Sequence, residues 1–153
     1  CLERSARFMN PSRILPDLQC SLVCDGIRQE TTGNLILLGV MDRILSMQYP
    51  LQVGQLFIVN RWTAGKGQFT QVVRVLGSDQ TTVLHRSESK MNLPDPIATA
   101  TNVHAVGGFQ LPAPGPYWVE VLIDDVMKLR YALPAFQVQQ QPQQGGAKPP
   151  SAG

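Results

Sequence analysis

The sequence predicts an all-β fold: a single antiparallel β-sandwich of seven or eight strands, immunoglobulin-like or C2-like, with little helix. Short apolar runs recur along the chain and are separated by Gly, Asp and Ser residues that favour turns. Several runs alternate apolar and polar residues, which is typical of strands with one buried face. No long segment repeats apolar residues every 3.6 positions, as an amphipathic helix would.

The chain of 153 residues is long enough for one domain with a sizeable core. We expect an N-terminal extension over residues 1–13, a sandwich over 14–138 and a tail over 139–153. The tail is rich in Gln, Pro and Gly, so it cannot offset its ordering entropy by burial, and disorder is predicted. Met9 is taken as the biological start. The alternative makes Cys1 the lipid-bearing residue of a processed bacterial lipoprotein.

The first two apolar runs lie within Leu18–Leu45 and flank a polar connection that contains Gly26 and Gly33. This arrangement predicts an opening β-hairpin. The segment Asn34–Val40 is apolar on both faces, which is typical of a central strand. The predicted strands are, in chain order, Leu18–Asp25, Asn34–Ile44, Gly54–Thr63, Gln68–Leu76, Thr81–Arg86, Thr101–Leu111, Tyr117–Asp124 and Lys128–Leu133.

The connections between the later runs carry turn residues. Ala64–Gly67, Gly77–Gln80 and Asp124–Asp125 are each expected to close an antiparallel hairpin. Ser87–Ala100 contains two prolines and no clear alternation, so we expect the long crossover between the sheets there, with room for one helical turn at its end. The final run, Met127–Leu133, alternates regularly and is expected to have one buried and one solvated face.

Two cysteines occupy the first predicted strand. Cys20 and Cys24 are four residues apart, about 13 Å along a strand, which is too far for a disulfide. Both are expected to be core thiols, which suits a reducing compartment. His85 and His104 stand singly in separate strands, so no metal site is predicted, and His104 is expected to be a hydrogen-bonded core residue.

No catalytic motif is visible in the chain. His85–Ser89 places a histidine, a serine and a glutamate close in sequence but lacks the frame of a serine hydrolase. Asp124–Asp125 invites a calcium site, yet the other loop acids are scattered among different connections, and a turn role is favoured. We therefore predict that the chain is not an enzyme and that it has no catalytic, cofactor-binding or metal-binding residues.

The charges are few and dispersed. A net charge of +2 arises from 13 basic and 11 acidic residues, without the basic patch of a nucleic-acid-binding protein. No apolar run is long enough to span a bilayer. Charged residues make up 16% of the chain, against about 25% in typical globular proteins, which favours contact with other proteins. A cytoplasmic location is expected, with a protein partner or a homo-oligomer and no nucleic acid.

Four residues form the candidate interaction surface. Arg61 and Arg74 fall in neighbouring predicted strands and are expected to share a solvated sheet face. Trp118 and Leu122 lie on the less regular face of their strand, because Tyr117 takes the more regularly apolar one. The remaining large aromatic residues are expected in the core.

Two motifs carry a resemblance to a known family: Asn34–Ile44, which reads NLILLGVMDRI, and Gly115–Val121, which reads GPYWVEV. Weaker similarity lies at Pro50-Leu51, Asn102–Phe109 and Arg130–Leu133. Over about residues 14–138 the chain resembles uncharacterised bacterial β-sandwich domains of unknown function. The resemblance implies the sandwich fold but no activity, so there are no family site residues to carry over.

The expected function is non-catalytic binding or assembly through protein–protein contacts. It depends on the absence of catalytic motifs together with the low charge. The alternative is a module that binds carbohydrate through exposed aromatic residues, or calcium through loop carboxylates.

Overall fold

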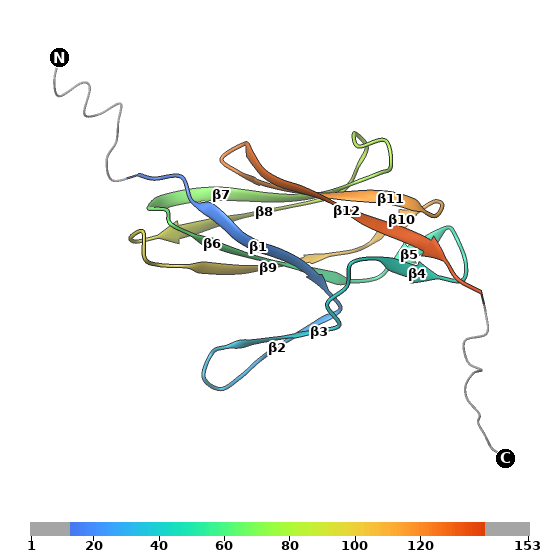
Figure 1. The fold of residues 1–153 in the computed structure, drawn as a ribbon, viewed down its shortest axis with the longest axis horizontal. Coiled ribbons are helices and arrows are strands. Elements are labelled where there is room, and N and C mark those ends of the chain that lie inside the picture. Colours follow the sequence, from blue (N-terminus) through green and yellow to red (C-terminus); the bar gives the residue numbers. More distant parts are fainter. Residues whose placement is uncertain (1–12, 140–153) are drawn as a thin grey trace.

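The computed structural model describes residues 13–139, which form twelve β-strands and no helix (Figure 1). No helix long and apolar enough to cross a membrane is therefore found within that range. The strands are β1 (Asp17–Cys24), β2 (Gly26–Gln29), β3 (Leu35–Leu38), β4 (Ile44–Ser46), β5 (Leu51–Val53), β6 (Leu56–Thr63), β7 (Gly67–Leu76), β8 (Val83–Leu93), β9 (Ala100–Val106), β10 (Phe109–Leu111), β11 (Gly115–Ile123) and β12 (Val126–Gln137).

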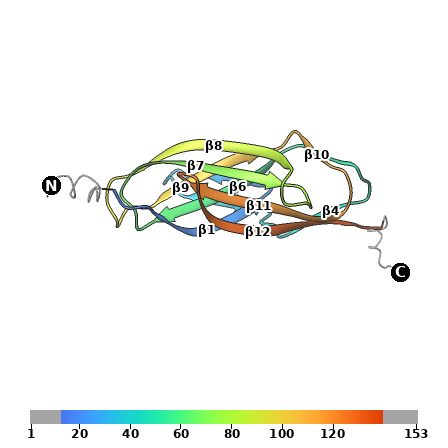
Figure 2. The ribbon, with the colours of Figure 1, turned by 90° about the horizontal axis from the view of Figure 1, so that it is seen from above.

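Two sheets lie face to face, which confirms the predicted all-β sandwich (Figures 1 and 2). The larger sheet has the strand order β4-β12-β11-β7-β8, and the smaller has the order β1-β6-β9. Two further pairs, β10-β5 and β2-β3, extend from this body. Every pairing is antiparallel except that of β12 with β4.

The core lies between the two sheets because each sheet turns alternate apolar side chains inward. In β11 the residues Val119, Val121 and Ile123 are fully buried, and they pack in one cluster with Ile58 and Trp62 of β6. Burying one such aliphatic side chain stabilises the fold by about 1.5–3 kcal/mol. The period-two pattern that predicted the strands therefore also predicted their buried faces.

The structure has more strands than the seven or eight predicted, because glycines divide several of the predicted runs. Gly39 adopts φ +65° and separates β3 from β4. Gly107 and Gly108 separate β9 from β10. A Cβ at Gly107 would lie 2.2 Å from the Gly54 carbonyl oxygen, so only glycine allows this close approach.

The prediction for the opening hairpin was wrong in its pairing. β1 pairs with β6 along its length, and the hairpin is formed instead by β2 and β3, from Gly26 to Leu38. Asn34–Val40 is accordingly no central strand, because β3 belongs to a two-stranded ribbon outside both main sheets. This segment is apolar on both faces, as its sequence shows, but it is not buried between two layers of this chain.

Two of the three predicted hairpin turns are confirmed. Gly77–Gln80 lies in the connection between the antiparallel strands β7 and β8, and Asp124–Asp125 connects β11 to β12. Ala64–Gly67 connects β6 to β7, which belong to different sheets, so the predicted hairpin is wrong there. A bridge between Ile14 and Lys66 fixes this crossover against the start of the described chain.

The predicted crossover over Ser87–Ala100 is too long, because β8 continues to Leu93. Only residues 94–99 pass from one sheet to the other, and they contain a turn in which Asp95 accepts hydrogen bonds from the backbone of Ile97 and Ala98 (2.9 and 3.1 Å) rather than a helical turn. The part of β8 after Arg86 was missed because small serines, instead of large apolar residues, take inward positions there.

The last strand was predicted to have one buried and one solvated face, and this holds only over the second half of β12. In β12 Leu133 is buried, but Leu129 and Met127 are exposed. A bulge beside Leu122 shifts the register, so that Met127 lies opposite Leu122 on the outer face. The predicted segments over residues 1–13 and 139–153 lie outside the described residues, apart from Arg13 and Gln139.

Candidate binding surfaces

The β2–β3 hairpin stands off from the outer face of the smaller sheet (Figure 1). At its base the Asp25 N–H donates to the carbonyls of Leu38 and Gly39 (2.9 and 3.2 Å). A Cβ at Gly39 would lie 2.9 Å from the Asp25 Cβ, so the base requires glycine. At the tip the Glu30 N–H donates to the Asn34 carbonyl (2.8 Å). The hairpin is thus fixed at both ends by backbone hydrogen bonds.

A cleft of about 600 Å³ separates the hairpin from the β1-β6-β9 sheet. We call it the hairpin cleft. Its walls are mostly apolar, with a few polar groups among them, and it has the size and character of a small-molecule pocket. It is lined by Cys20, Leu22, Gly33, Asn34, Leu35, Leu37, Val59, Arg61 and Thr101.

The hairpin carries large apolar side chains on both faces. Leu35 and Leu37 are half-buried and line the hairpin cleft. Ile36 and Leu38 alternate with them and are 41% and 39% exposed, and Val40, two residues further on, is 54% exposed. We call Ile36 and Leu38 the outer hairpin face. Sequence reasoning did not single these residues out, although their apolar pattern was visible, because it placed them in a central strand.

Arg61 lies at the edge of the hairpin cleft. Its Nε donates to the Thr101 hydroxyl across the β6–β9 pair (2.9 Å), which fixes the start of the guanidinium. Cys20 is its cross-strand neighbour on β1. Among the described residues Arg61 has no carboxylate within ion-pair distance. The guanidinium is therefore an unpaired charge, within the described chain, beside an apolar space.

A row of charged residues crosses the outer face of the larger sheet. Glu120 on β11 is 1% exposed, and its two carboxylate oxygens accept separate arginines: Arg74 of β7 and Arg130 of β12, each at 2.5 Å. Arg130 also donates to Gln80 (3.0 Å), and Arg86 of β8 lies opposite Arg74. This row was missed from the sequence, although Glu120 is the one charged residue in β11.

Trp118 and Leu122 lie on the same outer face, on either side of Glu120 along β11. Both are half-buried. Leu76 and Val72 of β7 lie directly opposite Trp118 and Leu122 on the same face, and both are buried. The outer face is thus apolar at two places and charged between them.

The structure divides the candidate interaction surface. It brings Arg74 together with Trp118 and Leu122 on the outer face of the larger sheet. Arg61 lies on the outer face of the smaller sheet, so the prediction that Arg61 and Arg74 share one face is wrong. The cause is the crossover at residues 64–67, which was taken for a hairpin. Arg74 moreover already forms an ion pair with Glu120.

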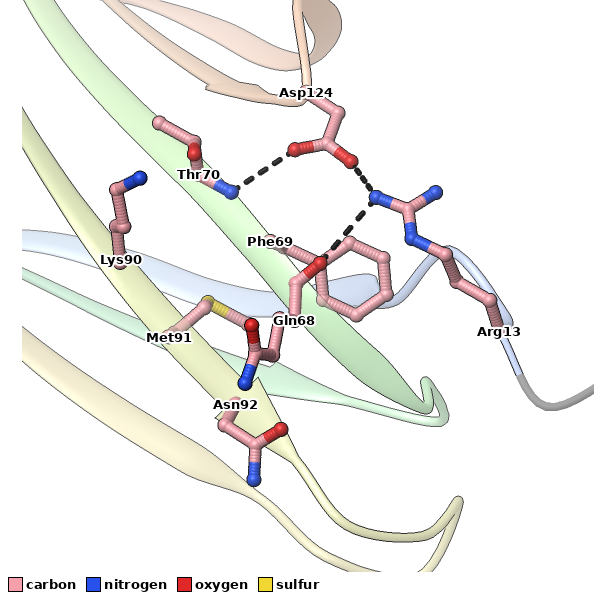
Figure 3. Close-up of a pocket in the computed structure, with 8 residues that line it drawn as sticks. All are labelled: Arg13, Gln68, Phe69, Thr70, Lys90, Met91, Asn92 and Asp124. Carbon is pink, nitrogen blue, oxygen red and sulfur yellow. Dashed lines mark hydrogen bonds and ion pairs between the residues drawn. The ribbon is translucent and has the colours of Figure 1, made fainter.

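A second hollow, of about 550 Å³, lies at the end of the sandwich where the described chain begins (Figure 3). Arg13 stacks over the Phe69 ring at 4.6 Å, forms an ion pair with Asp124 and donates to the Gln68 carbonyl (3.3 Å). The other carboxylate oxygen of Asp124 accepts the Thr70 N–H (2.9 Å). These contacts attach Arg13 to the sandwich and use both oxygens of Asp124.

The acidic turn at Asp124–Asp125 therefore has a structural role, as predicted. Both residues adopt positive φ (47° and 68°), which matches a two-residue hairpin loop. Within residues 13–139 no group of three or more His, Cys, Asp or Glu side chains is positioned to hold a metal ion.

His85 and Ser87 of the β8 segment do not form a site together. The His85 ring lies 5.8 Å from the Phe109 ring, centroid to centroid, whereas Ser87 shares a hydrogen bond of 3.0 Å with Nδ1 of His104 from β9, which is 3% exposed. Burial lowers the pKa of His104. The prediction of a hydrogen-bonded core histidine is confirmed. Glu88 lies on the opposite side of β8 and forms an ion pair with Arg86 (3.0 Å).

The two cysteines differ in burial, so the core prediction is right for one and wrong for the other. Cys24 is buried and Cys20 is exposed, and both are free thiols. They share the outer face of β1, but only Cys24 lies at the covered base of the hairpin. Burial raises the pKa of the Cys24 thiol.

The largest aromatic residues are core residues, as predicted. Trp62 is fully buried and donates its indole N–H to Gln71 (3.0 Å). Tyr117 is buried, and its hydroxyl donates to the Ala113 carbonyl (2.6 Å). Trp118 is half-buried, with its indole nitrogen enclosed and without a hydrogen-bond partner among the described residues.

Comparison with known proteins identifies a family. A search of curated proteins finds no relative of this chain. A model of a family of unknown function, DUF6941, matches residues 19–136, which include both sheets, the hairpin and the cleft. The resemblance to uncharacterised domains is thereby confirmed, and the chain belongs to the DUF6941 family, whose function is unknown.

Proposed function

We propose that this protein is a non-catalytic binding module that engages another protein through the outer hairpin face. The observation that carries the proposal is the composition of the β2–β3 ribbon. Ile36 and Leu38 are exposed, although the opposite side of the same ribbon is already apolar and half-buried. A two-stranded hairpin is at best marginally stable in water, so one with two apolar faces gains stability when both are covered.

The surroundings of the outer hairpin face support contact with a protein. Arg28 lies beside Ile36 on the neighbouring strand, and it is exposed. Apolar side chains next to an arginine are typical of the residues that carry binding energy in protein interfaces. No charged residue lies between Asn34 and Met41, so nothing there opposes burial.

The proposed setting is the cytoplasm. Cys20 is an exposed free thiol and Cys24 a buried one, and unpaired thiols suit a reducing compartment. The carbohydrate and calcium alternatives gain no support from the geometry, since Trp62 and Tyr117 are buried and Asp124 is held by Arg13 and Thr70.

The proposal is tested by placing a photo-crosslinking amino acid at Ile36 of the full chain in its source cells. We expect a single defined adduct with one other protein. The matched control carries the same group at Val83, which is equally exposed on the far sheet (47%). An adduct from Val83 alone, or none from Ile36, would refute the proposal.

A further inference from the structure

The hairpin cleft is a separate feature from the outer hairpin face, because it lies on the other side of the ribbon. Its walls come from two elements: the hairpin and the outer face of the β1-β6-β9 sheet. Leu37 contributes from the hairpin side, and Leu22 contributes from the sheet side together with its buried cross-strand neighbour Val59. Leu22 remains 39% exposed, so the cleft leaves apolar surface uncovered.

The size of the cleft sets the size of its occupant. About 600 Å³ lies in the middle of the range for small-molecule pockets, roughly 300–1,000 Å³. The cleft is therefore suited to a small molecule with an apolar body.

The charged residue that lines the cleft indicates which polar group the bound molecule carries. Arg61 is the only charged residue that lines the cleft, and it has no carboxylate partner among the described residues. Its Nε is held by Thr101 (2.9 Å), which leaves the two terminal nitrogens of the fork as free donors. A planar guanidinium binds a carboxylate through two parallel hydrogen bonds.

From these three observations we propose that the hairpin cleft binds a carboxylic acid with an apolar chain. The chain lies between Leu22 of β1 and Leu37 of the hairpin, and the carboxylate pairs with Arg61 at the edge. The proposed ligand is such a carboxylic acid in free form. When the acid is bound in the cleft, it covers the inner face of the β2–β3 hairpin. It therefore stiffens the hairpin, which also carries the outer hairpin face.

The test uses decanoate as the probe, with decan-1-ol and decylamine as matched ligands of the same chain length and different charge. Binding to the full chain is measured by isothermal titration calorimetry below the micelle concentration of each probe. We expect decanoate to bind at least about tenfold more tightly than either control, since only decanoate can form the charge-assisted bidentate pair with the guanidinium.

Three variants locate the site. Arg61→Gln removes the charge and is expected to weaken decanoate binding about tenfold without affecting decan-1-ol. Arg28→Gln makes the same change of charge on the opposite face of the hairpin and is expected to leave both affinities within about twofold. Leu37→Asp introduces a charge into the apolar wall and is expected to abolish decanoate binding.

The exposed thiol gives a second readout that does not depend on calorimetry. Cys20 lines the cleft and lies opposite Arg61, so bound decanoate is expected to slow its alkylation, while buried Cys24 stays unreactive throughout. The proposal is overturned if decanoate shows no saturable binding, if decan-1-ol binds equally well, or if Arg61→Gln leaves the affinity unchanged. These outcomes do not bear on protein binding by the outer hairpin face.

Discussion

Glu120 shows how one residue organises a sheet face. It is almost fully buried on the outer side of β11, where alternation would put a solvated side chain, because two arginines lie over it. The two arginine side chains are 32% and 38% exposed, so they shield the Glu120 carboxylate from water while remaining partly solvated themselves. A carboxylate removed from water in this way depends on both arginines for its solvation.

The first prediction concerns this carboxylate. Glu120→Gln should lower the free energy of unfolding by about 2 kcal/mol, less than for a fully buried pair because the arginines are partly solvated. Urea unfolding at neutral pH measures it. The matched control, Glu88→Gln, removes the exposed partner of Arg86 and should cost about 0.5 kcal/mol or less. Equal losses in the two variants would contradict this account of Glu120.

The second prediction concerns His104. Burial lowers its pKa in the folded protein below the ordinary value of 6.5, so the unfolded chain binds a proton more readily than the native one. Stability is therefore full above pH 6.5 and should fall as the pH drops through 6 toward 5. His104→Gln should flatten this dependence between pH 5 and 6.5 in urea unfolding. An unchanged slope in the variant would show that His104 does not cause the loss.

At the scale of the element, the hairpin depends on one glycine. Gly39 adopts φ +65° and closely approaches Asp25. The third prediction is that Gly39→Ala destabilises the hairpin base by about 1–2 kcal/mol, seen as faster amide exchange over Gly26–Leu38. The control is Gly54→Ala, where a Cβ meets no atom within 4 Å. Fast exchange in the control, or none in Gly39→Ala, would be inconsistent with this.

Alternation predicted the strands wherever large apolar residues face inward, as in β11, but not where the core accepts small polar ones. β8 turns Ser87 and Ser89 inward, and Ser87 is held there by His104 of the other sheet. That contact is seventeen positions away in the chain and cannot be read from the local pattern. The end of β8 was therefore missed, although its beginning was found.

Pairing between strands was the hardest feature to predict. Cys20 and Cys24 were correctly placed on one face of β1, yet only the position of the hairpin decides which is covered. Arg61 and Arg74 were correctly placed in strands, but the sheet to which each belongs depends on the crossover after β6. Sequence periodicity gives the face of a residue and not the partner of its strand.

For the molecule as a whole, the two sheets differ in what their outer faces carry. The two main sheets share a closed apolar core, and the outer face of the larger sheet has its charges paired internally. The smaller sheet instead carries the hairpin, the cleft and the unpaired Arg61. The proposed binding activities thus fall on one side of the sandwich, and the opposite sheet serves as the scaffold.

The most direct measurement uses the partner protein identified by crosslinking at Ile36. It compares how much of that partner is captured by the full chain and by a variant whose outer hairpin face is charged. Ile36→Asp/Leu38→Asp should reduce capture at least about tenfold, because two exposed apolar contacts become charged. Val83→Asp/Val126→Asp, with similar exposure elsewhere, should capture as the unmodified chain does. If the hairpin variant remains folded and captures as much protein as that control, the outer hairpin face is not the binding surface.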